Sequence, residues 1–302
     1  MGKFIIKTLI FISIILSSVY FLPKIFQDKL EPIFLNKETK GTPTYEVGNY
    51  KDYYAAVRSS IINLEPSINI VFKDDYLKSN PNKVLSYAND LIRTLGPGNY
   101  IRKYSITHKK STIYEFYTIT YNYEKSLDEI KKQSLKVDEI VKNKVKQITS
   151  PSMSNYEKER AIHDFIVKNT RYDHENFEKQ TTPIESHTAY GVFVHKTAVC
   201  EGYAIAMKKM LDEANIESII VIGKAGEYDH AWNMVNLDKQ WYHVDPTWDD
   251  PVYKVNGKLV DIISYDYLNL TDGDLQKTHT WEKKNYPKAT GTKYGSKNNS
   301  GN

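Results

Sequence analysis

The stretch CEGYAIAMKKML, residues 200–211, decides how the rest of this 302-residue chain is interpreted. Its apolar residues recur at helical spacing, so it predicts a helix with one buried face. Cys200 is the only cysteine of the chain and stands in the first turn of that helix. A helix N-terminus carries partial positive charge and favours the thiolate form of a cysteine, and Gly202 lets another segment approach closely. Cys200 is therefore a candidate nucleophile, although a lone cysteine can also be a small buried apolar residue. The predicted buried face consists of Tyr203, Ala204, Met207, Met210, Leu211 and Ala214.

A histidine and an aspartate follow the cysteine on two predicted strands, HAWNMV (residues 230–235) and QWYHVD (residues 240–245). A symmetric turn over residues 236–239 would pair Asn236 with Lys239 and place His230 directly opposite Asp245. The two Cβ atoms would then lie about 5 Å apart, which suits an imidazole–carboxylate hydrogen bond. A shift by one residue would put them on opposite faces of the sheet. Cysteine, histidine and aspartate together are the groups of thiol-based acyl transfer.

From about Tyr156 to Pro287 the chain resembles the bacterial transglutaminase-like superfamily, which has a papain-like core. The matching phrases are EKERAIHDFIVKNTRYD (157–173), HTAYGVFVHKTAVCEGYA (187–204), DHAWNMVNLDKQWYHVDPTWDDP (229–251) and, more weakly, YLNLTDGDLQKTHTWEKKNYPKA (267–289). The resemblance implies an α+β fold, in which the helix bearing the cysteine packs on an antiparallel sheet bearing the histidine and aspartate. It implies Cys200 as nucleophile, His230 as general base and acid, and Asp245 as the group that orients His230.

The oxyanion donor is less clear from the sequence. Superfamily members related to animal transglutaminases use a tryptophan upstream of the cysteine. All four tryptophans of this chain follow Cys200. We therefore expect the Cys200 backbone N–H to serve as donor, with Tyr190 as a second candidate.

Composition excludes several other classes of protein. Hydrophobic residues make up 40% of the chain and charged residues 26%, with a net charge of +4. Lysine and glutamate interleave along the predicted helices, which indicates a solvated surface and no nucleic-acid partner. The chain has no zinc-binding spacing, P-loop or dinucleotide fingerprint, and its histidines are scattered. We expect neither a metal nor another cofactor. The oligomeric state stays open.

The N-terminal segment TLIFISIILSSVYFL (Thr8–Leu22) is uncharged and follows Lys3 and Lys7. It is typical of an uncleaved membrane anchor, residues 1–22, with the lysines in the cytoplasm and the globular part outside. The alternative is a signal peptide that is cleaved before secretion. Either way Cys200 would be a free thiol in an exported protein.

Four further segments follow this N-terminal region. We expect a linker over residues 23–48, a small α+β domain over 49–148, a catalytic domain over 151–289 and a disordered tail over 290–302. Ser154 and Glu157 form a predicted capping box at the first catalytic helix. Other polar residues nearby favour structural roles: His163 and Asp164 in helix packing, and Asp249 and Asp250 in a turn.

These observations predict an exported thiol-dependent acyltransferase or peptidase that acts through a thioester. Its substrates would be carboxamide or peptide bonds of envelope proteins or cell-wall peptides. Hydrolysis and cross-linking stay open alternatives, because the choice depends on cleft shape and water exclusion. A catalytically silent binding or scaffold module at the cell surface is the second hypothesis. A polysaccharide-active enzyme would need a pair of carboxylates that the sequence does not offer.

Overall fold

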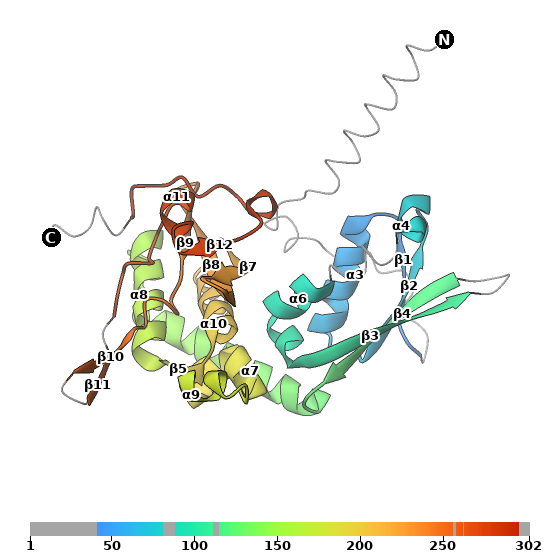
Figure 1. Ribbon diagram of the computed structural model, residues 1–302, viewed down its shortest axis with the longest axis horizontal. Helices are drawn as coiled ribbons and strands as arrows, with labels where there is room; N and C mark the ends of the chain where they lie inside the picture. The colour runs from blue at the N-terminus through green and yellow to red at the C-terminus, as the bar shows by residue number, and fades with distance from the viewer. Residues whose placement is uncertain (1–40, 81–87, 111–114, 256–257, 262, 296–302) are drawn as a thin grey trace, which may run out of the picture. The chain divides into compact units, whose positions relative to one another are not determined.

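The computed structural model describes residues 41–80, 88–110, 115–255, 258–261 and 263–295, and it divides into two compact units (Figure 1). One unit contains residues up to 89, 104–121 and 282–287. The other contains residues 90–103, 122–281 and those from 288 onward. No helix among the described residues is long and apolar enough to cross a membrane. The predicted anchor Thr8–Leu22 lies outside the described residues.

The first unit is built on a four-stranded sheet of order β1-β2-β4-β3, in which β1 is parallel to β2 and β2 antiparallel to β4. Strand β2 alternates partly buried and fully buried side chains, so Ile68, Ile70 and Phe72 share the core face. Helix α3 packs on β1 and β2. Its elements are β1 (Thr44–Val47), α3 (Tyr50–Ile62), β2 (Ser67–Phe72) and α4 (Asp75–Ser79), with most of β3 (Ile101–Lys110) and β4 (Glu115–Tyr123). Helix α6 (Ala88–Thr94) begins in this unit and continues in the second, and η1 (Gly96–Tyr100) belongs to the second.

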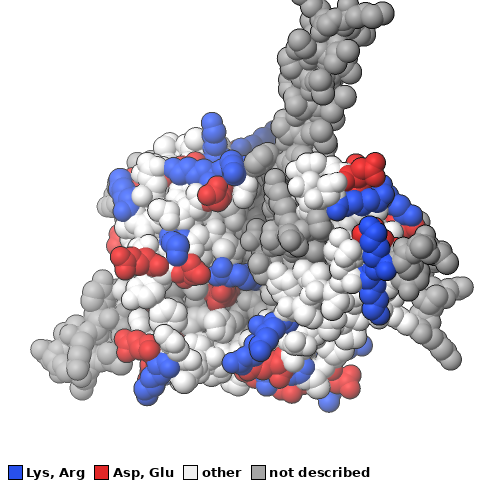
Figure 2. Space-filling model, turned by 45° about the vertical axis from the view of Figure 1, so that its right-hand side comes forward, with Lys and Arg blue, Asp and Glu red and all other residues white. Residues whose placement is uncertain are grey.

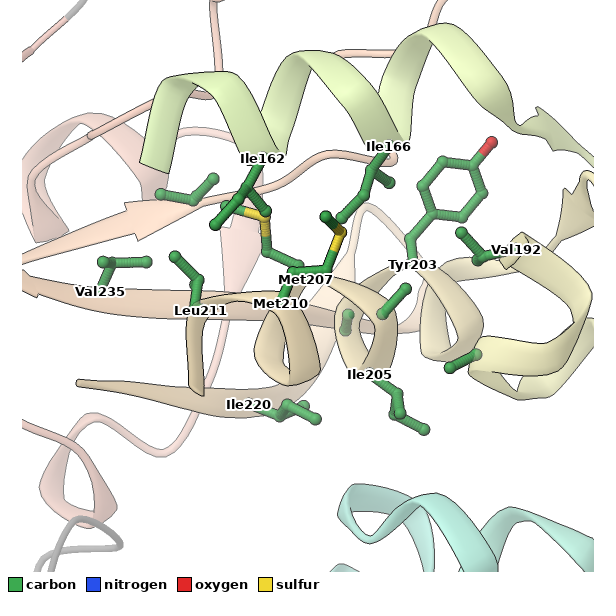
Figure 3. Close-up of a cluster of buried hydrophobic side chains, with 14 of the residues drawn as sticks. Ile162, Ile166, Val192, Tyr203, Ile205, Met207, Met210, Leu211, Ile220 and Val235 are labelled. Atoms are coloured by element: carbon green, nitrogen blue, oxygen red, sulfur yellow. The ribbon is translucent and has the colours of Figure 1, made fainter. Parts of the chain in front are cut away.

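The second unit surrounds helix α10 (Cys200–Glu213), the helix predicted from residues 200–211. Its predicted face is buried except for Ala214, which follows the end of the helix and is partly buried. Ile205 and Ala206 are buried as well, which makes α10 a central helix. It contacts α7 (Leu127–Ile148) and α8 (Asn155–Asn169), and also the sheet strands β7 (Ser218–Ala225) and β8 (Tyr228–Leu237). In Figure 3, Ile162 and Ile166 of α8 point toward Met207 and Met210 of α10.

The sheet of this unit has the order β12-β7-β8-β9 and is antiparallel throughout. The expected arrangement, a cysteine-bearing helix packed on an antiparallel sheet, is therefore confirmed. Its remaining elements are β5 (Arg171–Tyr172), α9 (His174–Glu178), η2 (Ile184–His187), η3 (Gly191–His195), β6 (Thr197–Ala198), β9 (Gln240–Val244), β10 (Val252–Val255), β11 (Lys258–Asp261), α11 (Asp272–Leu275) and β12 (His279–Thr280). A last short turn of helix, η4 (Lys283–Asn285), falls in the segment 282–287 of the first unit.

Local sequence signals explain where the helices begin. Ser126 caps α7 by accepting the N–H of Glu129, and α7 buries Ile130, Val137, Val141 and Val145 along one face. The predicted capping box of α8 is present, with Ser154 and Glu157 each accepting from the other's backbone N–H.

The compact units divide the chain differently from the expected boundaries. Strand β1 lies inside the segment expected to be a linker, because it pairs with β2. Helix α7 packs on α8 and α10, and so belongs with the unit that carries Cys200. The segment expected to be a disordered tail makes defined contacts within its described residues, because Tyr294 stacks on Tyr156 and donates a hydrogen bond to Asp238.

On the face drawn in Figure 2, basic and acidic side chains lie next to one another. Ion pairs such as Lys208–Asp212 and Lys209–Asp138 reflect the interleaved charges of the sequence.

Candidate active site

Cys200 is the first residue of α10, at the end of the helix that meets the short strand β6. The N-cap residue, Val199, makes no side-chain cap hydrogen bond. The first N–H groups of a helix have no acceptor within the helix and give this end partial positive charge. The sulfur of Cys200 therefore lies beside backbone donors that can stabilise negative charge, including its own N–H.

Gly202 allows this close packing, as the sequence indicated. A Cβ atom at Gly202 would lie 2.6 Å from the carbonyl oxygen of Ser186 and 2.9 Å from Cβ of Ala198. These neighbours belong to η2 and β6, the segments that lead into Cys200. A glycine here therefore fixes the start of α10 against the segments before it.

His230 and Asp245 are in direct contact, with 2.7 Å between Nε2 of the imidazole and Oδ2 of the carboxylate. Both are buried, His230 on β8 and Asp245 just after β9. The side chain of Cys200 also lies close enough to His230 to raise the pKa of that imidazole. The structure thus brings the three residues proposed from sequence into one cluster, in the order cysteine, histidine, aspartate.

The strand register that led to this expectation is wrong by two positions. Leu237 pairs with Gln240 and Asn236 with Trp241, so the turn consists of Asp238 and Lys239. Both turn residues have positive φ, 52° and 65°, as a two-residue type I′ hairpin requires. Asp245 is therefore not opposite His230. A shift of two keeps Asp245 on the same face of the sheet as His230. Because the chain turns after β9, the two side chains still meet.

The charge state of His230 follows from its surroundings. Burial alone would lower the pKa of His230, but the negative charge and hydrogen bond of Asp245, together with Cys200, outweigh burial and raise it to about 10. His230 is thus protonated at neutral pH. Burial would raise the pKa of Asp245, whereas the charges and hydrogen bonds of His230 and His279 lower it.

Asp245 accepts four hydrogen bonds. Its Oδ1 accepts the backbone N–H groups of Thr247 at 3.0 Å and Trp248 at 3.2 Å. Its Oδ2 accepts Nε2 of His230 and Nε2 of His279, the latter at 3.1 Å. Since every partner is a donor, the site is built for an ionised carboxylate. The sequence did not single out His279.

Aromatic rings enclose the carboxylate side of this cluster. Trp232 stacks near His230, with ring centroids 5.9 Å apart and planes 22° apart. Trp248 lies over His279, with centroids 4.6 Å apart, and Tyr267 lies 5.7 Å from the same ring. These rings exclude water from the His230–Asp245–His279 contacts, which strengthens each hydrogen bond.

The ligand atoms of His230, Asp245 and His279 lie within 4.8 Å of one another, an arrangement that could hold a metal ion. The contacts that both imidazoles make to Oδ2 have the lengths of N–H···O hydrogen bonds. We interpret the cluster as hydrogen-bonded.

The second oxyanion candidate, Tyr190, has its ring contacts elsewhere. Its ring lies 5.2 Å from that of His195 and has Nζ of Lys136 5.8 Å from its centre. Neither partner belongs to the Cys200 cluster, so the structure gives Tyr190 no support as a donor.

Tyr172 is a residue near Cys200 that the sequence analysis missed. Strand β5 pairs in parallel with β6, which places Tyr172 beside Ala198. Burial raises the pKa of Tyr172, and so do the nearby charges of Cys200, Glu201 and Asp245. The sequence shows Tyr172 in the phrase NTRYD, but it gives no sign that two strands as short as β5 and β6 pair with each other.

A second buried polar cluster supports the segment after Asp245. Nε2 of His163 lies 3.0 Å from Oδ2 of Asp249, and Oδ1 of Asp249 accepts the N–H of Tyr267 at 2.9 Å. Asp250 accepts a hydrogen bond from the hydroxyl of Tyr203 in α10. The two aspartates expected in a turn therefore also tie that turn to α8 and α10.

Comparison with known proteins finds a matching sequence profile and two related curated proteins. Residues 142–246 match the sequence profile of the transglutaminase-like superfamily. Kyphoscoliosis peptidase of Mus musculus is 28% identical over 116 residues, 34% of this chain and 17% of that protein. The Homo sapiens protein of the same name is 27% identical over 147 residues, 45% of this chain and 21% of that protein. The chain spans about a fifth of the length of these curated relatives.

A solved structure described as a TGase aligns with a TM-score of 0.37 and 20% identity, covering 69% of this chain and 59% of that one. A TM-score this low does not indicate a shared function. The profile match includes Cys200, His230 and Asp245. The chain therefore carries a domain of the transglutaminase-like superfamily.

Proposed function

We propose that the protein is a thiol-dependent acyltransferase or peptidase that forms a thioester on Cys200. Its substrates are carboxamide or peptide bonds in proteins or peptides. The observation that carries the proposal is that His230 interacts with both other residues. It hydrogen-bonds Oδ2 of Asp245 at 2.7 Å, and Cys200 lies close enough to raise the pKa of its imidazole.

The first chemical step forms the thioester. The Cys200 thiolate attacks the carbonyl carbon of the amide, and backbone N–H groups at the start of α10 stabilise the oxyanion. The C–N bond then breaks, and protonated His230 gives its proton to the leaving nitrogen. Asp245 holds the ring in position during both events.

The second step releases the acyl group and restores the enzyme. A water molecule or an amine attacks the thioester carbonyl while neutral His230 accepts its proton. The C–S bond breaks, and Cys200 leaves as a thiolate beside the protonated imidazole. Water gives hydrolysis, and an amine gives a new amide bond and so a cross-link.

The proposed location is the outer face of a membrane, with residues 1–22 as the anchor and envelope proteins or cell-wall peptides as substrates. It is supported by the uncharged run Thr8–Leu22 after Lys3 and Lys7. Fractionation with N-terminal sequencing tests it. A mature chain starting beyond about residue 20 in the medium would indicate a cleaved signal instead.

The chemistry is tested by trapping the acyl-enzyme. The full-length protein is mixed with a glutamine-containing peptide, quenched in acid, and mapped by mass spectrometry. We expect an acyl adduct on Cys200 that is absent in Cys200→Ala, together with a loss of several orders of magnitude in turnover. Undiminished turnover by Cys200→Ala would contradict the thiol mechanism.

The alternative is a catalytically silent binding or scaffold module. The burial of Cys200, which is 6% exposed, is the observation that favours it. Alkylation by iodoacetamide at pH 7 separates the two hypotheses, since an inert structural thiol does not react. We expect rapid alkylation of Cys200 that slows in His230→Ala, because the thiolate loses its ion-pair partner.

A further inference from the structure

An aromatic group that the proposed chemistry does not use lies next to Cys200 and His230. Phe177 and Tyr228 are large apolar side chains that stay exposed, by 37% and 69%. Their ring centroids are 6.1 Å apart, and Phe177 also lies 5.9 Å from Tyr172. His174 joins the group, 4.7 Å from Tyr172. We call these four residues the aromatic corner.

The aromatic corner reaches both the cysteine and the histidine sides of the site. On the cysteine side, Tyr172 pairs with Ala198, two residues before Cys200. On the histidine side, Tyr228 begins β8 two residues before His230. Side chains two apart on a strand share a face, so Tyr228 is on the same face as His230. Phe177 of α9 contacts both tyrosines and joins the two sides.

The ring geometry favours one kind of occupant. The planes of Phe177 and Tyr228 are 67° apart, and those of Tyr172 and Phe177 are 66° apart. Rings at such angles and separations pack edge to face against each other. Their exposed parts form an angled apolar surface against which a side chain can pack, whereas a flat sugar face is better served by one open, coplanar ring surface. Exposed apolar area at the edge of a site is also a common mark of a binding surface.

We propose that the aromatic corner is a specificity subsite that takes an aromatic or large aliphatic side chain of a peptide substrate, next to the reacting amide. The inference rests on the proposed function, since it assumes that the amide carbonyl reaches Cys200. Burial of the inserted side chain against Phe177 and Tyr228 supplies binding energy that orients the carbonyl.

The test uses peptide chloromethyl ketones that carry Phe, Leu or Gly next to the electrophile, with labelling of Cys200 read by mass spectrometry. The readout is the ratio of second-order rates for the Phe and Gly probes within each protein. This ratio cancels any change in the reactivity of the thiol itself. We expect a ratio of about ten or more in the wild-type protein, the scale of a filled apolar pocket.

Variants then locate the preference. Phe177→Ala and Tyr228→Ala should each lower the ratio severalfold, and Tyr228→Phe, which keeps the ring, should preserve it. Leu135→Ala removes an equally exposed apolar side chain, 61% exposed on α7, and should leave the ratio unchanged.

The outcomes separate this inference from the proposed function. If iodoacetamide and every probe fail to label Cys200, both the proposed function and the proposed subsite are refuted. If Cys200 is labelled but the Phe and Gly probes react equally, only the subsite is refuted. Competition by N-acetylglucosamine oligomers that Phe177→Ala abolishes, without a side-chain preference, would also refute it and indicate a sugar surface.

Discussion

Nε2 of His279 lies 3.1 Å from Oδ2 of Asp245, the same carboxylate oxygen that Nε2 of His230 contacts at 2.7 Å. His279 is fully buried, and its Nδ1 lies 2.8 Å from the hydroxyl of Thr278. With the proton on Nε2, the ring donates to Asp245 and accepts from Thr278. His279 thus holds the residue that orients His230.

We expect His279→Leu to lower turnover about tenfold, the effect of one buried hydrogen bond of about 1.4 kcal/mol. His279→Gln should restore most of the loss, because its side-chain amide can donate to Asp245. The hydrogen bond from His279 lowers the pKa of Asp245. Loss of this hydrogen bond should therefore raise the pKa of Asp245. As the pH is lowered, alkylation of Cys200 should then stop at a higher pH than in the wild-type protein.

The pH profile distinguishes a positioning role from a structural one. A merely structural His279 would lower the melting temperature of both variants equally and leave the acid limb of the alkylation profile in place. That result would contradict the assignment.

Asp245→Asn should damage the site severely, although asparagine keeps the shape of the side chain. In the structure all four partners of the carboxylate are donors. The amide NH2 must therefore face either the two imidazoles or the two backbone N–H groups, and one pair loses its acceptor. We expect a turnover loss on the order of 10⁴ from the wrong His230 tautomer, and about 1–3 kcal/mol lower stability.

Two measurements check this prediction, steady-state turnover and unfolding in denaturant. Asp272→Asn serves as a matched control, because this carboxylate bonds His243 outside the cluster of Cys200. A turnover loss in Asp245→Asn no larger than in the control would sink the prediction.

The sequence predicted the helix of Cys200 and its strands because apolar periodicity is a local property. Burial at Met207 and Met210 follows directly from helical spacing. The turn at Asp238 and Lys239 was placed wrongly because neither residue is the glycine that normally marks a type I′ turn. The contact of His230 with Asp245 survived this error, since a shift of two keeps both on one face.

The missed residues share a different cause. His279 lies in β12, a strand of two residues that pairs with the far end of β7. Tyr172 lies in β5, which is equally short. Strands this short carry no periodic pattern, and their partners are distant in sequence. Only the folded chain shows that these residues adjoin Cys200 and Asp245.

The buried His163 predicts an alkaline loss of stability. Burial alone would lower the pKa of His163, but its hydrogen bonds and charge contacts with Asp164 and Asp249 outweigh burial and raise it to about 9. A raised pKa stabilises the fold fully below the ordinary value of about 6.5. That contribution is lost as pH rises toward 9. We therefore expect the melting temperature to fall between about pH 6.5 and 9.

His163→Gln isolates this contribution. It should cost about 3–5 kcal/mol at pH 6, because Asp249 is left buried without its ion-pair partner. The difference from the wild-type protein should shrink toward pH 9. A difference that stays constant across this range would show that His163 is neutral in the folded protein.

Gly202→Ala should damage the site through the backbone alone. The added Cβ would lie 2.6 Å from the carbonyl oxygen of Ser186 and 3.0 Å from that of Thr188, and neither backbone atom can rotate away. The start of α10 must then shift, at a cost of about 1–3 kcal/mol. Since Cys200 is the first residue of that helix, its contact with His230 should lengthen and alkylation by iodoacetamide should slow.

Gly273→Ala is the matched control, because a Cβ there meets its nearest neighbour, Oγ1 of Thr271, at an ordinary 3.6 Å. We expect that variant to unfold within about 0.5 kcal/mol of the wild-type protein and to react at the same rate. If Gly202→Ala lowers stability but leaves the alkylation rate unchanged, the position of the helix start does not control the thiol. If it changes neither, the close approach of η2 and β6 to α10 is not as tight as the structure places it.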